Sequence, residues 1–413
     1  MRKMEMIMKS FVSSCLRGGA LLACLATAAQ AVPLSTKVWS PFFDMNVTQA
    51  AYFPAGGSVF EGAQVNTALG WNVKRGEKDN ILALYNMRFT GAGFQFPDTQ
   101  EFSSKDLLHH FSLEYSWQTG ERSRLRPGLV YGTDFTRTAA GEIWGTGLYD
   151  NHYFGGQVAW DKSLQMKGKD ALFTAQWLIR SVKFPNYTDL LREFQGSASN
   201  VELAGGLKDQ LFNELGVRLA WNHMAYGLKV NMLDFTNEKV VESNGSYGAT
   251  KQKDSNLAFT MDWEGKVWIF DAMPGFSFTS HASNQNFLLF ESITDPLPEF
   301  RENYYSYGEL EFNFPFIAPM SRTSKWAWIL GMDYRYRSYS DRPIRSAENV
   351  FLGEVQHNGM FTLNTGWRKR INDISAWTLM WTFVHANSNN KFERYLPYNY
   401  YGNSLSLGYQ LTY

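Results

Sequence analysis

The residues best placed for chemistry are His281 and Ser283, which a single alanine separates. A histidine can accept the proton of a serine hydroxyl, and the activated oxygen can then attack an acyl ester, if the two groups lie within hydrogen-bond reach. A strand would direct both side chains to one face, because alternate residues of a strand share a face. The sequence therefore holds a candidate for ester hydrolysis, with a polar, non-catalytic histidine as the alternative.

The stretch 281–284, His-Ala-Ser-Asn, resembles the His-x-Ser-Asn motif of outer-membrane phospholipase A and of the lipid A deacylase family. The resemblance implies a barrel hydrolase that acts on membrane lipids, with Ser283 as nucleophile and His281 as base. It covers four residues. Gln285 stands where the phospholipase pattern has a glycine.

The rest of a catalytic site is not evident around this motif. Glu291 and Asn303 are the nearby residues that a third catalytic member would come from. Phe276 and Phe278 occupy the alternate positions of the same expected strand. If those rings face lipid, the histidine and serine face the interior, whereas a serine that cleaves lipid must reach the membrane.

A second set of residues with chemical potential is charged and recurs at alternate positions of otherwise apolar segments. We expect these side chains to line the interior of a barrel. They are Arg124, Arg126, Arg180, Arg218, Lys229, Asp262, Glu264, Glu309, Glu311, Asp333, Arg335 and Arg337. Basic residues prevail in the first half of the wall, and carboxylates prevail in the tenth to twelfth expected strands, 255–264, 273–283 and 304–316. This distribution predicts a transverse field that orients dipolar solutes and mildly selects ions. The alternative is that the charges pair with one another and brace the interior.

The elements that position these residues are short segments of alternating character, which is the pattern of a membrane barrel. The clearest are 107–118, 255–264 and 375–386, where every second residue is large and apolar. The expected strands are 43–53, 59–73, 80–89, 107–118, 124–136, 149–161, 170–183, 211–222, 225–236, 255–264, 273–283, 304–316, 325–338, 352–368, 375–386 and 403–413. The prediction is an all-β, transmembrane, antiparallel up-and-down barrel of about 16 strands, with 14 as the main alternative.

The connections support this topology because short and long ones alternate strictly. The short ones are 74–79, 119–123, 162–169, 223–224, 265–272, 317–324 and 369–374. The long ones are 90–106, 137–148, 184–210, 237–254, 284–303, 339–351 and 387–402. Outer-membrane barrels have short periplasmic turns and longer external loops. A soluble sandwich or propeller gives no reason for such alternation.

The segment 403–413 places Leu405, Leu407, Tyr409, Leu411 and Tyr413 on one face, with small or polar residues between them. It resembles the C-terminal assembly signal of bacterial outer-membrane barrels. Ser406, Gly408, Leu411 and Tyr413 fill the positions of that signal. The resemblance implies recognition by the barrel assembly machinery.

The N-terminal segment predicts export from the cytoplasm. Residues 1–31 combine a basic start, an apolar run and the ending Ala29-Gln30-Ala31, which together predict a signal peptide cleaved after Ala31 and a barrel over 32–413. A lipoprotein site at Cys24 is the alternative. Both cysteines, Cys15 and Cys24, would be removed with the signal peptide, so disulfides, thiolate metal sites and cysteine nucleophiles are not expected in the mature chain.

Composition narrows the class further. Aromatic residues make up 16% of the chain, the mean hydropathy is negative, and no apolar run after the signal approaches a membrane helix. The formal net charge is zero, which gives no reason to expect a nucleic-acid partner. No phosphate-binding or metal-ligand motif is present, so we expect no cofactor and no metal.

Two external segments add hypotheses. The stretch 184–210 contains a short amphipathic pattern that Thr188 would cap, and it predicts either a constriction folded into the mouth or a cover for the rim. The stretch from His385 to Tyr401 faintly resembles the last hairpin of surface lipoprotein assembly modifiers.

The interpretation that best fits the sequence is an outer-membrane, porin-like channel for passive diffusion of small hydrophilic solutes, not an enzyme. Its expected partners are outer-membrane lipid and lipopolysaccharide, the assembly machinery and the solutes themselves, and a homo-oligomer stays open. An export or surface-assembly barrel for polysaccharide or lipoprotein, and a lipid hydrolase using His281 and Ser283, are the alternatives.

Overall fold

The structure is a computed structural model that describes residues 39–55, 58–75, 78–91, 100–101, 105–137, 143–188, 205–289, 299–321, 323–393 and 398–413. The predicted signal peptide, 1–31, and both cysteines lie outside these ranges. In the described part of the chain, no helix has the length and apolar character needed to cross a membrane.

Sixteen strands form the wall of a closed antiparallel barrel, and five short strands accompany them. The wall strands are β1 (Trp39–Pro54), β2 (Phe60–Lys74), β3 (Asp79–Gly91), β5 (Lys105–Gly120), β6 (Ser123–Arg137), β7 (Asn151–Met166), β8 (Lys169–Lys183), β9 (Gln210–Trp221), β10 (Met224–Val241), β11 (Tyr247–Trp263), β14 (Gly275–Ser283), β17 (Tyr307–Pro319), β18 (Trp326–Arg345), β19 (Phe351–Arg370), β20 (Ser375–Ser388) and β21 (Tyr400–Thr412). The short strands are β4 (Gln100–Glu101), β12 (Gly265–Val267), β13 (Phe270–Ala272), β15 (Phe287–Leu289) and β16 (Glu299–Arg301).

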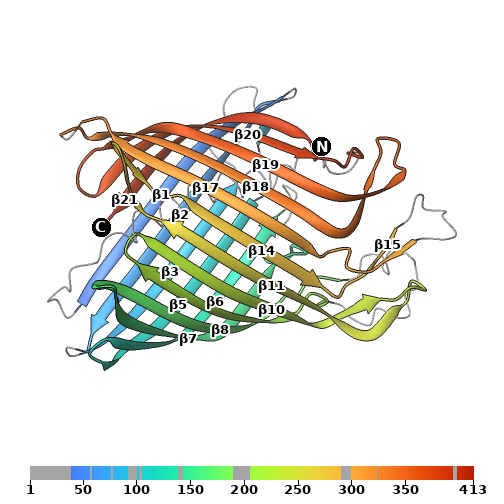
Figure 1. The fold of residues 1–413 in the computed structure, drawn as a ribbon, viewed down its shortest axis with the longest axis horizontal. Coiled ribbons are helices and arrows are strands. Elements are labelled where there is room, and N and C mark those ends of the chain that lie inside the picture. Colours follow the sequence, from blue (N-terminus) through green and yellow to red (C-terminus); the bar gives the residue numbers. More distant parts are fainter. Residues whose placement is uncertain are drawn as a thin grey trace.

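Each wall strand pairs with the next along the chain, and β1 pairs with β21 to close the cylinder. The tilted strands of the front wall cross those of the back wall (Figure 1). The end of β21 lies at one end of the barrel, and the β15–β16 hairpin projects from the other (Figure 1). This confirms the predicted fold, its strand number and its up-and-down order.

The strands end in tight turns at the end of the barrel where β21 finishes, which we call the short-turn end. Lys167 and Gly168 form the turn between β7 and β8, with φ of 50° and 75°. Two-residue hairpin turns require such positive φ values, which glycine adopts without steric cost. The opposite end, called the long-loop end, carries the longer connections.

Two of the predicted long loops are mostly strand. β10 and β11 continue to Val241 and from Tyr247, so the predicted loop 237–254 shortens to a turn at 242–246. Likewise β18 and β19 leave only 346–350 of the predicted loop 339–351. The strict alternation of loop lengths is therefore wrong in detail. At the short-turn end, the predicted turn 265–272 is itself a small hairpin of β12 and β13.

The two faces of the wall differ in chemistry, as the alternation predicts. Large apolar side chains with more than a third of their surface exposed lie on the outer face of most wall strands, among them Leu129, Leu215, Phe259, Trp367 and Leu405. Polar and charged residues alternate with them and face the interior. A wall with one apolar and one polar face is the arrangement of a membrane barrel.

Candidate pore lining and its ion-pair networks

The first charged cluster of the inner face joins β5, β6 and β7. Arg126 contacts Asp161 through Nε–Oδ2 at 2.7 Å and Glu114 through Nη1–Oε2 at 3.1 Å. Thr174, on β8, donates its hydroxyl to the other oxygen of Asp161 at 2.8 Å. The three charged side chains are between 15% and 29% exposed, so this is a half-buried network in which one cation joins two carboxylates.

The second charged cluster joins β17 and β18. Arg337 contacts Glu309 through Nη2–Oε2 at 2.7 Å, and Arg335 contacts Glu311 through Nη2–Oε1 at 3.3 Å. The Arg337 guanidinium also lies 4.1 Å from the centroid of the Tyr307 ring. Both arginines of β18 in this cluster are therefore paired with carboxylates of the neighbouring strand β17.

The remaining predicted carboxylates and Lys229 occupy scattered positions. Lys229 Nζ lies 3.4 Å from Glu214 Oε2, and Asp333 accepts a hydrogen bond of 3.3 Å from Asn364. Asp262 lies on β11 at the register of Ala225 and Gly275. Glu264 lies beyond the end of β11, exposed at the short-turn end.

Arg180 is held differently from the paired cations. Its guanidinium carbon lies 4.7 Å from the ring centroid of Tyr153 and 4.4 Å from that of Phe212. Tyr153 packs over Gly132, where any Cβ would overlap the phenol ring, and its hydroxyl lies 2.7 Å from Nδ1 of His110. Among the described residues, no carboxylate forms an ion pair with Arg180, and its buried Nε has no hydrogen-bond partner.

The two other predicted arginines also differ from the clusters. Arg124 is exposed near the start of β6, at the register of Asp161, and Arg218 lies on β9 at the register of Gly227. No ion pair joins either of them to a carboxylate within the described ranges. Three of the predicted cations therefore have no carboxylate at ion-pair distance within the described ranges, and Arg180 is the one held between two aromatic rings.

The candidate catalytic pair lies on the inner face of β14, but its two side chains serve different partners. His281 Nδ1 lies 2.8 Å from Asn256 Oδ1, and the ring stacks on Tyr307 with centroids 4.8 Å apart. Ser283 is 5% exposed, and its hydroxyl accepts a hydrogen bond of 3.1 Å from the backbone of Gln285. The serine and the histidine do not bond to each other, and neither faces the membrane.

Gln285, which occupies the glycine position of the phospholipase motif, lies at the centre of the polar contacts around Ser283. Its amide accepts from the backbone N–H of Val241 at 3.0 Å and donates to the Lys239 carbonyl at 3.1 Å and to Gln252 at 3.2 Å. The motif therefore forms a buried hydrogen-bond network that ties the end of β14 to β10 and β11. A nucleophile–base pair is not assembled here.

The predicted constriction over 184–210 lies largely outside the described residues, including its helical pattern from Leu190 to Phe194. The described ends of this stretch are anchored to the rim. Asp209 accepts from the backbone N–H of Phe184 at 2.8 Å and from Lys183 Nζ at 2.9 Å. Asn186 donates to the carbonyl of Gly147 at 3.1 Å.

Three of the predicted assembly residues lie on β21, and Tyr413 follows its end. Ser406 and Gly408 face the interior at the register of Ala50 and Thr48, and Leu411 lies on the outer face at the register of Met45. Tyr413 bonds through its backbone to Phe43 near the start of β1. In the described part of the chain, no group of three or more histidine, cysteine or acidic side chains is arranged to hold a metal ion.

The sequence analysis did not predict which side chains contact the inner-face arginines. Glu114 and Asp161, which complete the Arg126 cluster, were not among the predicted pore-lining residues. Glu114 stands between Leu113 and Tyr115, and Asp161 follows Trp160, so the alternation rule places both on the inner face. The sandwich around Arg180 has no local signal, because Tyr153 and Phe212 come from the two neighbouring strands and register decides their contact.

No known protein family matches the sequence, and no curated protein matches it. Solved barrels share its architecture at low identity. A bacterial polysaccharide outer membrane secretin is 8% identical, with 90% of this chain and 97% of that chain covered and a TM-score of 0.42. The trimer form of OmpT, an outer membrane protein of Vibrio cholerae, is 10% identical over 91% of this chain and 100% of that chain, with a TM-score of 0.43.

OccAB3 of Acinetobacter baumannii is 6% identical, with coverage of 91% and 100% and a TM-score of 0.40. Likeness at this level concerns the barrel fold alone, and the function has to be argued from the residues of this chain. The fold itself, a closed barrel of sixteen antiparallel strands with an apolar outer face, is that of a bacterial outer-membrane protein.

Proposed function

We propose that this chain is an outer-membrane channel through which small hydrophilic solutes diffuse passively. The observation that carries the proposal is the inner face of a closed sixteen-stranded wall, which bears charged and amide side chains on nearly every strand. Membrane barrels of sixteen to eighteen strands leave an aqueous channel. A solute that crosses such a barrel moves along hydrated polar groups and requires no cofactor.

The proposal includes export to the outer membrane with removal of residues 1–31. The intact mass of protein purified from that membrane tests this part. A mass that begins at Val32 supports it, and a retained N-terminus contradicts it.

Planar-bilayer recording tests the channel itself. We expect stepwise, ohmic conductance from purified protein, and repeated insertions that leave the bilayer sealed would overturn the proposal. Single cysteines sharpen the experiment, because both native cysteines lie within 1–31. Thr279→Cys places a thiol on the inner face of β14, and Phe278→Cys places one on the outer face, where Phe278 is 39% exposed.

A charged methanethiosulfonate reagent added from the aqueous phase should reduce the conductance of the Thr279→Cys variant. The same reagent should leave the Phe278→Cys variant unchanged, since that thiol faces lipid. Equal effects on both variants, or none on either, would show that current does not pass along the inner face.

A further inference from the structure

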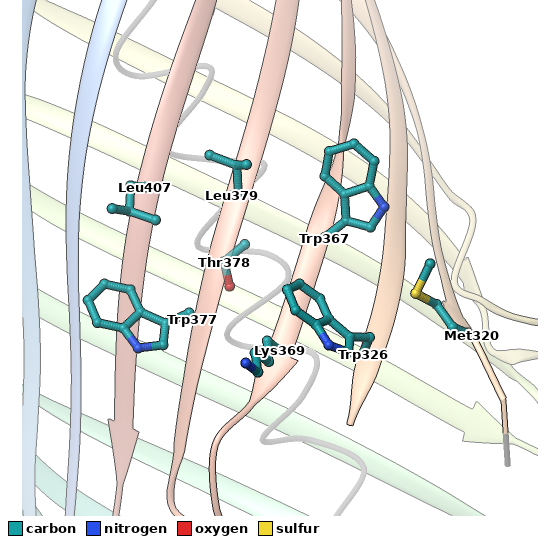
Figure 2. A pocket seen from close by; sticks show the side chains of 8 residues that line it. All are labelled: Met320, Trp326, Trp367, Lys369, Trp377, Thr378, Leu379 and Leu407. Atoms are coloured by element: carbon teal, nitrogen blue, oxygen red, sulfur yellow. The ribbon is translucent and has the colours of Figure 1, made fainter. Parts of the chain in front are cut away.

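A groove of about 620 Å³ lies on the outer face of the barrel near the short-turn end (Figure 2). Strands β18 to β21 form it together with Met320, which follows β17, and its lining is almost entirely apolar. The lining residues are Met320, Trp326, Trp367, Lys369, Trp377, Thr378, Leu379 and Leu407. Its size falls in the range of about 300–1,000 Å³ that is typical of small-molecule sites.

Strand register arranges the groove in two rows that run across four strands. The row nearer the short-turn end is Trp326, Lys369, Trp377 and Tyr409, and the next row is Trp328, Trp367, Leu379 and Leu407. The first row is therefore aromatic with one cation, and the second becomes aliphatic toward β21. Figure 2 shows Lys369 between Trp326 and Trp377, with Leu379 and Leu407 beyond them.

Lys369 is the one charged side chain among the eight residues that line the groove. Its Nζ lies 5.2 Å from the ring centroid of Trp326. Within the described part of the chain, no carboxylate reaches ion-pair distance of this ammonium. Lys325 lies beside it at the turn and donates to the Ile371 carbonyl at 3.1 Å, and Asp373 is the acidic residue of the neighbouring turn.

Along the groove, the cationic, aromatic and aliphatic side chains follow the same order as the headgroup, interfacial region and acyl chain of one phospholipid. A lysine near a strand end extends its ammonium toward the headgroup level while its stem lies on apolar surface. Indole rings suit the boundary between headgroups and hydrocarbon. The aliphatic row of Leu379 and Leu407 lies one step deeper, at the level of acyl chains.

We propose that this groove binds one phospholipid of the leaflet at the short-turn end. The lipid phosphate pairs with Lys369, and an acyl chain lies along Trp367, Leu379 and Leu407. Charge complementarity identifies the occupant, because the unmatched ammonium needs an anion and the surrounding wall accepts only hydrocarbon. The site rests on the membrane-spanning fold and is independent of what passes through the barrel.

Native mass spectrometry of the full chain, delipidated in detergent and titrated with dioleoylphosphatidylglycerol, tests the proposal. We expect one lipid per chain, and a loss of affinity of about five-fold for Lys369→Gln, the effect of one lysine near an anionic headgroup. Lys369→Arg should keep the affinity. Lys266→Gln is the matched control, since Lys266 is at the same end with a side chain 76% exposed and pairs with Asp271.

Dioleoylglycerol, which lacks the phosphate, should bind wild type about five-fold more weakly than the phospholipid, and this comparison decides the matter even if Lys369→Gln fails to fold. Equal affinity for the two lipids would overturn the proposal. So would an equal effect of Lys266→Gln, or an oligomer that carries no lipid and dissociates in Trp367→Ala, because the groove would then be an interface between copies of this chain.

Discussion

Phe43 and Tyr413 exchange two backbone hydrogen bonds, from Phe43 N to Tyr413 O at 2.8 Å and from Tyr413 N to Phe43 O at 2.7 Å. These bonds join the first and last wall strands at the short-turn end. The pairing continues through Met45–Leu411 and Val47–Tyr409 to the other end of β21. The barrel is thus closed by a ladder that leaves neither strand with a free edge, as a membrane requires.

The first prediction concerns Tyr413 as part of an assembly signal. Tyr413→Ser should reduce the amount of folded barrel in outer membranes if Tyr413 belongs to the predicted assembly signal, because that signal would lose an aromatic side chain. Tyr401→Ser is the control: Tyr401 lies on the same strand and outer face, at the opposite end, and is 56% exposed against 75% for Tyr413. Heat-modifiable gel mobility of membrane fractions measures assembly. Equal losses from the two substitutions would assign the effect to stability.

The second prediction tests which face of β21 contacts lipid. Leu405 is 48% exposed on the outer face, and Ser406 is the adjacent inner residue. Leu405→Arg should destabilise the barrel by about 2–4 kcal/mol, the cost of an arginine near the bilayer midplane. Ser406→Arg should cost less, because its charge enters the polar interior. Urea unfolding of barrels in lipid vesicles measures both, and the reverse order would invert the assignment of faces.

The strands were predictable because lipid and water impose opposite demands on alternate residues. That signal disappears where both faces are wet. The part of β11 from Tyr247 to Asp254 is polar on both faces, so the sequence resembles a loop while backbone pairing to β10 still forms. The same reason applies to the end of β18, where residues 338–342 read Ser-Tyr-Ser-Asp-Arg and the strand continues to Arg345, beyond its predicted end at 338.

The inner charges were predictable as positions, but their pairing was not. Alternation places Arg126 on the inner face, whereas its contacts with Glu114 and Asp161 depend on register across three strands. These pairs are local, so the first half of the wall is less positive than a count of arginines predicts. Whether the predicted transverse field shapes transport stays a prediction, which the next experiment addresses.

The third prediction is that Arg180 favours anions. Its guanidinium has a fixed position between Tyr153 and Phe212 and no carboxylate partner among the described residues. Arg180→Gln should lower the chloride-to-potassium permeability ratio by about two- to five-fold, since unit charges about 4 Å apart interact by about 1 kcal/mol in water. The reversal potential in a salt gradient measures the ratio. An unchanged ratio would mean that ions do not pass near this residue.

The fourth prediction concerns pH and Tyr304, which follows β16 at the long-loop end, outside the membrane-spanning segments. Its ring is 9% exposed and stacks on Phe287 with centroids 4.5 Å apart. Burial raises the pKa of the Tyr304 phenol, while the nearby Arg342 opposes this. A raised folded-state pKa gives stability that is complete below the unfolded pKa of about 10 and is lost as the pH rises through the folded value.

Absorbance at 295 nm, recorded as wild type minus Tyr304→Phe, should therefore show one phenol that ionises above pH 10. The difference in urea midpoint between the two proteins should narrow as the pH rises from 9 into that range. A phenol that ionises at its ordinary pKa would contradict the burial of this loop.

The last prediction is that the Arg126 cluster stabilises the wall. Arg126→Gln leaves Glu114 and Asp161 half-buried without their cation, and we expect a loss of about 1–3 kcal/mol in the free energy of unfolding. Asp161→Asn in the Arg126→Gln background should cost less than Asp161→Asn alone, because the pair is already broken. Lys266→Gln, which removes an exposed pair, should cost at most about 1 kcal/mol. Additive costs for Arg126 and Asp161 would show that the two side chains are hydrated separately, and the inner wall would then be held by its backbone ladder alone.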